Sequence, residues 1–207
     1  MRLEDRVKQQ FPALSITLVS VLIGLDFADL VEQAHSRMVL WPLDLGTLRT
    51  WGQIFAMGSC AFGAWVTYTH IAIARQSIPS FADSVVGFVI PIPLLVGNSL
   101  IGLKDIWPWL YSGSLFLAIC LGATIWYFRL AHADNELVTL NYRYRQTRDL
   151  LVYAAGVAIY GSLAWADQHK LLSPLAEVIV AASPTPITLF SAHLFFRDWR
   201  QAIVAAS

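Results

Sequence analysis

The sequence predicts an all-α membrane protein, a polytopic bundle of about six transmembrane helices. Of its 207 residues, 57% are hydrophobic and only 14% are charged, and the mean hydropathy is +0.56. A soluble domain of this length carries about 25% charged residues, so these charges are too few to cover a surface in water. The apolar residues also form continuous runs without alternation, which indicates helices and not the strands of a membrane barrel.

Six apolar runs approach the length that a helix needs to cross a hydrocarbon core, roughly 20 residues. The fifth run is the shortest, at 17 residues, and needs its polar flanks to span. A count of four or five spans is therefore the main alternative. In chain order the six runs are Phe11–Leu30, Trp51–Ala74, Phe81–Leu103, Trp107–Phe128, Leu150–Ala166 and Leu172–Phe196.

The basic residues predict the orientation of these spans. With six spans, ten of the 14 Lys and Arg residues fall on one side and four on the other. The positive-inside rule places the richer side in the cytoplasm, so both termini are expected there. Residues 1–207 then form a single transmembrane domain with cytoplasmic segments at 1–10, 131–149 and 197–207. The expected location is the cell membrane, multi-pass, as in the inner membrane of a bacterium.

Signatures of catalysis and of metal binding are missing from the sequence. It has no GxSxG, HExxH, P-loop or GxGxxG pattern. Its short pairs of histidine and aspartate lie at the ends of runs, and a metal site would need a third ligand. Zero net charge gives no basic surface for nucleic acid. We therefore expect no enzyme activity, no cofactor, no metal and no nucleic-acid partner.

Polar residues inside the second and third runs are candidates for a path through the membrane. Pro91 and Pro93 remove backbone donors and will kink or break the third run. Asn98 follows within two turns, so Asn98 and the freed carbonyls are candidate ligands; a purely structural kink is the alternative. His70 and Asp83 lie within or at the start of a run, where ionisable groups are rare. They form either a polar clasp or part of a relay.

The first run carries a candidate pore face. Ser15, Leu18 and Leu22 share one face of a helix, and Asp26 and Asp29 continue toward the outer end. If several copies of this helix surround one axis, the leucines form an apolar constriction that gates by dewetting. The two acids then form a negative mouth that attracts cations. The alternative is that the leucine face meets lipid.

The order of these features resembles the six-helix, non-classical potassium channels of bacteria and endolysosomes, which lack a TVGYG filter. The resemblance implies a tetrameric homo-oligomer that conducts an inorganic cation, potassium among them. It also implies a constriction at Leu18. The family's Phe-Ser-Asp triplet reads Phe11-Pro12-Ala13 here, and its selectivity threonine falls on Val21. The residues that carry the resemblance are Phe11, Leu25-Asp26, Trp65, His70, Arg75 and Pro91-Ile92-Pro93.

Three functions follow from these patterns. The first is an ion-conducting channel, a homo-oligomer whose partners are the lipid bilayer, other copies of itself and a cation. The second is a small-solute or proton-coupled transporter that uses the proline-broken third and sixth runs. The third is a non-conducting scaffold or effector component of a multi-gene system.

Overall fold

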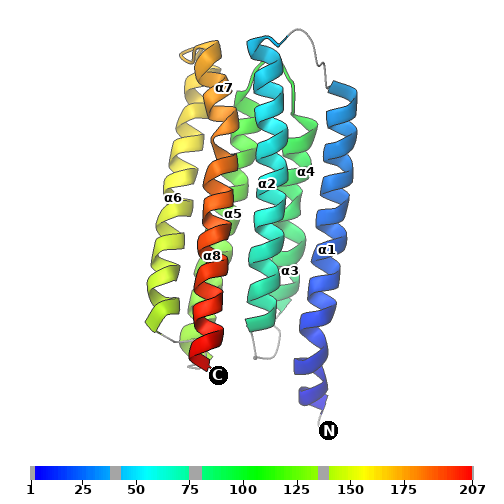
Figure 1. Cartoon of the computed structure of the whole chain (residues 1–207), viewed down its shortest axis with the longest axis vertical. Helices are drawn as coiled ribbons and strands as arrows, with labels where there is room; N and C mark the ends of the chain where they lie inside the picture. The colour runs from blue at the N-terminus through cyan, green and yellow to red at the C-terminus, as the bar shows by residue number, and fades with distance from the viewer. Residues whose placement is uncertain (1–2, 38–42, 75–80, 135–139, 207) are drawn as a thin grey trace.

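The structure is a computed structural model that describes residues 3–37, 43–74, 81–134 and 140–206. All regular structure within these ranges is helical, which confirms the predicted all-α class. The helices run side by side in one upright bundle (Figure 1). Their bounds are α1 (Leu3–Arg37), α2 (Leu45–Ala74), α3 (Phe81–Val89), α4 (Pro91–Ser99), α5 (Trp107–Asp134), α6 (Leu140–Gln168), α7 (Pro174–Ala182) and α8 (Pro184–Ala206).

Two pairs of consecutive helices, α3 with α4 and α7 with α8, each form one kinked rod, so the eight described helices make six rods. At Ile90, between α3 and α4, the backbone keeps helical angles (φ −60°, ψ −45°), and its N–H still donates to a carbonyl one turn earlier at 3.2 Å. Pro91 and Pro93 cannot donate such bonds, which explains the kink. Helices α7 and α8 meet in the same way at Ser183 and Pro184. The prolines therefore bend these rods without unwinding them.

Successive rods run in opposite directions, so the start of α1 and the end of α8 lie at the same end of the bundle (Figure 1). We call this the lower end. The upper end holds the start of α2, the α4–α5 loop of residues 100–106 and the α6–α7 loop of residues 169–173.

Within the described residues, four stretches of helix are long and apolar enough to cross a membrane, which indicates a multi-pass membrane protein. The short fifth run is one of them, because α6 extends past both of its ends and supplies 22 apolar-rich residues. The stretches are Ala13–Ser36, Trp107–Trp126, Thr147–Gln168 and Pro174–Leu194.

The ends of several helices extend beyond the apolar runs. Helix α1 already begins at Leu3, α5 continues to Asp134 and α6 begins at Leu140. The segments predicted as polar flanks, 1–10 and 131–149, are therefore largely helical where the structure describes them. Charged and amide residues such as Arg and Gln are good helix formers. A helix can therefore continue beyond the end of an apolar run.

Helix α2 occupies the middle of the bundle. It packs against α1 and α4 on one side and against α7 and α8 on the other, whereas α6 packs mainly on α5. Protein therefore covers α2 on two sides.

A close backbone contact joins α2 to α7. A Cβ atom at Gly52 would lie 3.0 Å from the backbone nitrogen of Ala182 and 3.2 Å from the carbonyl carbon of Ala181. Backbone atoms cannot move aside as the end of a flexible side chain can. Glycine at this position therefore permits the two helices to approach.

We expect Gly52→Ala to lower the free energy of unfolding by about 1–3 kcal/mol, because the added methyl forces α2 and α7 apart. The matched control is Gly122→Ala, where a Cβ would meet no atom within 4 Å. The control should match or slightly exceed the wild type, since alanine favours a helix by about 1 kcal/mol over glycine. Thermal unfolding in detergent, followed by tryptophan fluorescence, measures both. Equal midpoints for the two variants would contradict the close α2–α7 contact.

Candidate functional site

The inner face of α1 is defined by buried residues three or four positions apart. Val19, Ile23 and Leu30 belong to the hydrophobic core, and Ser15 and Asp26 are buried on the same face. This spacing follows one side of a helix. Ser15 and Asp26 therefore point into the chain's own bundle, toward α2 and α4.

The remaining residues of the predicted pore face and mouth lie around the flank of α1. Leu18, Leu22 and Asp29 are half-buried. The outermost side chains of this helix are apolar, with Leu14 67% and Leu25 58% exposed. The structure thus separates the predicted set into two buried polar residues and a half-buried flank.

Ser15 has a partner on the neighbouring helix. Its hydroxyl lies 2.8 Å from the hydroxyl of Tyr68 on α2, and both side chains are buried. A second bond runs between the same helices, because the indole of Trp65 donates to the Ser20 hydroxyl at 3.0 Å. Hydrogen bonds of this kind satisfy polar groups that are shielded from water. They hold α1 against α2.

Asp26 differs from Ser15, because its carboxylate has no partner. The residue is 1% exposed, and neither carboxylate oxygen accepts a hydrogen bond within the described part of the chain. Asn98 of α4 is 2% exposed and donates from Nδ2 to the backbone oxygen of Asp26 at 3.1 Å. The Asn98 Oδ1 atom also lacks a partner there. Three acceptor oxygens therefore stand unsatisfied on two neighbouring side chains.

The surroundings of this pair are apolar. Core residues Ile23 and Leu30 lie on α1 near Asp26, and Leu94 and Ile101 lie near Asn98 along the chain. A buried carboxylate without a partner costs several kcal/mol, on the order of the desolvation penalty of an ion in a protein. Such a group within a membrane-spanning segment is a functional candidate by default. We therefore take Asp26 and Asn98 as the candidate site and call them the Asp26–Asn98 pair.

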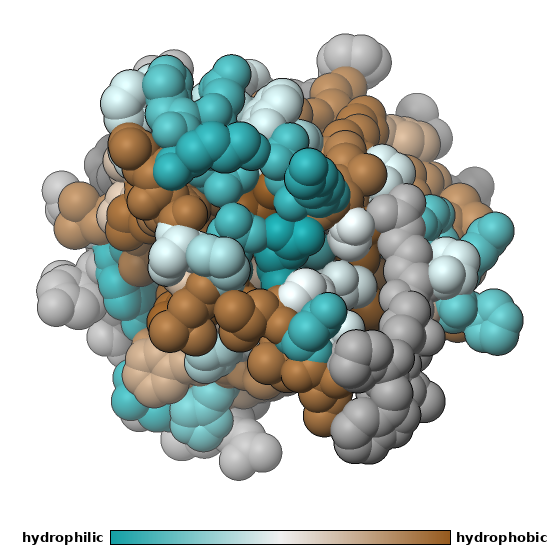
Figure 2. Space-filling view, turned by 90° about the horizontal axis from the view of Figure 1, so that it is seen from above, coloured by the Kyte–Doolittle hydropathy of each residue, from teal (hydrophilic) through white to brown (hydrophobic). Residues whose placement is uncertain are grey.

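A second polar cluster closes the upper end of the bundle. Arg49 of α2 contacts the carboxylate of Glu177 on α7 and donates to the backbone oxygens of Leu103 and Lys104 at 2.8 and 3.0 Å. The arginine and glutamate side chains are only 13% and 17% exposed. Figure 2 shows hydrophilic residues gathered near the middle of this upper face. We call the four residues the Arg49 clasp.

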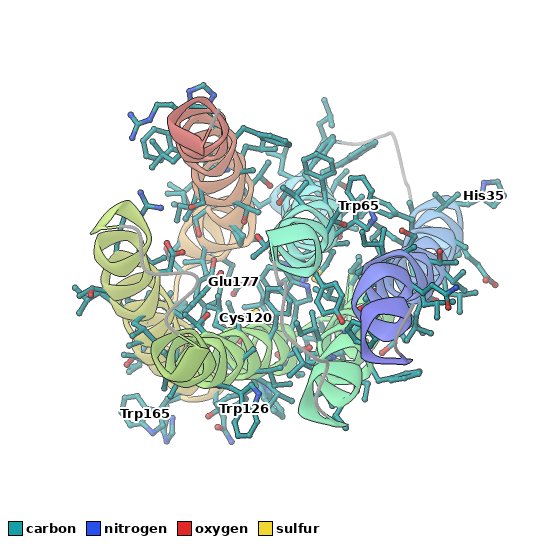
Figure 3. The ribbon with its side chains drawn as sticks, turned by 90° about the horizontal axis from the view of Figure 1, so that it is seen from below. His35, Trp65, Cys120, Trp126, Trp165 and Glu177 are labelled. Carbon is teal, nitrogen blue, oxygen red and sulfur yellow. The ribbon has the colours of Figure 1, made fainter. Side chains whose placement is uncertain are left out.

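Labelled side chains in Figure 3 separate the interior from the periphery. Glu177 lies inside the ring of helices, whereas His35, Trp126 and Trp165 project away from it. Trp126 is 40% exposed and Trp165 is 54% exposed. Exposed tryptophans near helix ends are typical of the level of lipid headgroups.

Three further polar contacts lie in the loops at the upper end. The Asp167 carboxylate accepts from the backbone N–H of Trp107 at 3.0 Å, and the Lys170 ammonium donates to Asp105 at 2.6 Å. The bond from Lys170 lowers the pKa of the Asp105 carboxyl, and the same bond raises the pKa of Lys170. Asp44 accepts from the Thr47 N–H at 2.7 Å at the start of α2, which lowers the pKa of Asp44.

Other predicted site residues lie outside what the structure describes. The side chains of His70 and Asp83 are among them, so their predicted meeting stays a prediction. In the described ranges no group of three or more His, Cys, Asp or Glu side chains is placed to hold a metal ion.

No protein-family model, curated protein or solved structure matches this chain. The candidate site therefore rests on its own chemistry.

Sequence reasoning did not identify Arg49 or Gln53 as important. Arg49 lies just before the second apolar run, at its predicted outer end, where the positive-inside rule expects few basic residues. That position was the available signal. Arg49 binds two residues of one loop, 54 and 55 positions away, and one residue of a helix 128 positions away. No local pattern in the sequence connects these positions.

We expect Asp26→Asn to raise the free energy of unfolding at neutral pH by about 1–3 kcal/mol, because the change removes a buried charge that has no partner. The contrasting variant is Ser15→Ala, which removes the buried hydrogen bond between Ser15 and Tyr68 that joins α1 to α2. It should lower stability by about 1 kcal/mol or more. Thermal unfolding of both proteins in the same detergent gives the comparison. If Asp26→Asn proves markedly less stable than the wild type, Asp26 has a stabilising partner and the candidate site is wrong.

Proposed function

We propose that this protein moves cations across a membrane, with the Asp26–Asn98 pair as the place where the cation is held on its way. The observation that carries the proposal is the Asp26 carboxylate, which is buried in a membrane-spanning stretch and unpaired in the described residues. Proteins keep such a costly group where it binds or relays a positive charge. A proposal of transport, and not of catalysis, also accords with the lack of a catalytic signature in the sequence.

The chemistry of the pair favours a cation of low charge. Two carboxylate oxygens and one amide oxygen are free to accept. Calcium takes six to eight oxygen ligands, about twice what the pair offers, and magnesium needs octahedral coordination. A monovalent cation or a proton needs fewer ligands and less negative charge than a divalent ion to replace the water that it loses on binding. The amide of Asn98 is held beside the Asp26 backbone through its Nδ2 bond, and its free Oδ1 is the neutral ligand that we assign to this site.

The membrane arrangement that we propose has six spans, with both termini in the cytoplasm. The six upright rods and the shared lower end of α1 and α8 support it. The division of basic residues, ten to four, then places the lower end in the cytoplasm. A bacterial inner membrane is the location that we propose.

A channel assembled from several copies is the first form that this function can take. The resemblance to the six-helix potassium channels favours it, and so does the apolar outer side of α1, which other copies can cover. In that form Leu18 and Leu22 form a constriction between protomers, and the Asp26–Asn98 pair, on the inner face of α1, holds the cation within each protomer and not on the shared axis. The alternative form is a coupled transporter within one protomer, favoured by two proline-kinked rods that both pack against α2.

The orientation can be tested by cysteine labelling with a membrane-impermeant reagent in a background free of native cysteines. A cysteine at Lys170 should react only from outside, and one at Ser207 only from the cytoplasm. The physical basis is the positive-inside rule applied to the six rods. Reaction of position 170 from the cytoplasmic side would overturn the six-span arrangement.

The transport function can be tested by cation flux into liposomes that contain the purified protein. We expect Asp26→Asn to reduce flux at least roughly tenfold, the effect of losing about 1.4 kcal/mol of interaction with the moving charge. Asn98→Leu should reduce it to a smaller extent, because one neutral ligand is lost. Glu32→Gln is the matched control, an exposed acid on the same helix, and it should leave flux unchanged.

The same flux measurement separates the alternatives. Leu18→Ser should raise leak if α1 lines a shared axis, because a wetted ring no longer excludes ions, and should change little if transport runs through one protomer. Saturation with a second, coupling ion indicates a transporter. No flux above empty liposomes for a folded wild-type protein, with co-purification of another membrane protein, would refute transport and favour the scaffold role.

A further inference from the structure

The Arg49 clasp joins three parts of the chain through a single guanidinium group. Arg49 belongs to α2, Glu177 to α7, and the two carbonyls to the α4–α5 loop. Bonds to a charged donor are stronger than bonds between neutral groups. The loop is therefore firmly attached to α2 at Leu103 and Lys104, while the Lys170–Asp105 ion pair attaches its later part to the α6–α7 loop.

The elements held by the clasp are the upper halves of the two kinked rods. Helix α4 lies between the kink at Ile90 and the clasped loop, and α7 lies between the kink at Ser183 and the α6–α7 loop. Proline kinks lack hydrogen bonds that would otherwise stiffen a helix, so they are the natural points about which such halves turn. Each nine-residue half is thus hinged at its lower end and, at or near its upper end, attached to Arg49.

The clasped loop directly follows Asn98. Leu103 and Lys104 come five and six residues after it, and the Ile101 N–H donates to the Asn98 carbonyl at 3.2 Å. Ile101 and Ile106 are fully buried. The loop therefore covers the upper end of α4 with apolar side chains, and water reaching Asn98 from above must displace them.

The conformation of Gly102 and its hydrogen bond to α2 also define the closed form of the loop. Gly102 has φ 71°, a conformation that favours glycine, and its N–H donates to the Gln53 side chain at 2.9 Å. Gln53 is one turn from Arg49 on α2 and is 1% exposed. Two neighbouring side chains of the central helix thus bind three backbone groups of the same loop.

We propose that the Arg49 clasp is the upper gate of the Asp26–Asn98 pair. While Arg49 binds the loop carbonyls and Glu177, the loop is closed over Asn98. When these bonds exchange for water, the upper halves of the kinked rods turn outward and open the site to the upper face. This inference rests on the proposed function for what passes the gate, although the opening itself can be measured without any flux.

The Arg49 clasp lies near the upper surface, where water can replace its hydrogen bonds. At 13% and 17% exposure, its two charged side chains lie near enough to the upper surface for water to replace their bonds. A pair deep in the bundle would separate only at the full cost of desolvating both ions. The Ser15–Tyr68 bond, by contrast, is fully enclosed and serves to hold α1 and α2 together.

Thiol accessibility tests the gate directly. In a background in which Cys60 and Cys120 are replaced by alanine, a single cysteine is placed at Asn98 or, as a second probe, at Ile101. A charged, membrane-impermeant thiol reagent is added to proteoliposomes from each side in turn. We expect slow labelling with Arg49 present and, for Arg49→Gln, labelling from the upper side that is roughly tenfold faster or more.

The matched control is Arg148→Gln, which removes an arginine paired with Asp149 on α6 and leaves the clasp intact. Its labelling rate should equal that of the parent protein. Glu177→Gln, which leaves the loop carbonyls bound, should give an intermediate rate. If Arg49→Gln does not fold, Glu177→Gln and Gln53→Ala carry the same test from the other ends of the contact.

The results separate the gate from the proposed function. A folded Arg49→Gln protein that labels no faster than the parent at both probe positions would overturn the gate and leave the clasp as a structural tie. Equal acceleration from both sides would also overturn it, since that reports general loosening. Faster upper labelling together with flux that does not depend on Asp26 would support the gate and refute the proposed role of Asp26.

Discussion

Helix α2 must fit between helices on two of its sides, and the arrangement of the other rods depends on that fit. Close approach requires small residues, and Gly52 meets the backbone of α7 at a distance that leaves no room for a side chain. On the opposite side, α1 and α4 pack against the same helix. Each polar group that this packing shields from water needs a partner, and most such groups find one within the protein.

Most of the buried polar groups that α2 encounters do find such a partner. Tyr68 meets Ser15, Trp65 meets Ser20, and Gln53 accepts from the loop at Gly102. Asn98 and a few other buried groups, such as the hydroxyl of Thr69, keep an atom without a partner in the described part of the chain. Asp26 stands out among them because it is ionisable and neither of its carboxylate oxygens has a partner there, which indicates a role other than holding helices together.

Charged contacts at the upper end of the bundle join elements that are distant in the chain. Arg49 of α2 contacts Glu177 of α7, and Lys170 contacts Asp105 in the loop before α5. Contacts that cross between elements restrict how those elements move. A change in charge at Arg49 or Lys170 is therefore expected to alter the packing of the upper end.

The sequence alone determined the helical class, the membrane-spanning character and the proline kinks, because composition, run length and the missing proline N–H act locally. It also singled out Asp26 and Asn98, since polar groups in apolar runs stand out. The sequence predicted that Ser15 and Asp26 face an axis shared by several copies of the chain. In the structure both side chains are buried and face α2 and α4 of the same chain. Helical periodicity shows which residues share a face, but not what that face meets. Only tertiary packing joined Asp26 to Asn98 and Arg49 to Glu177, because those contacts span 72 and 128 positions and no local pattern encodes them.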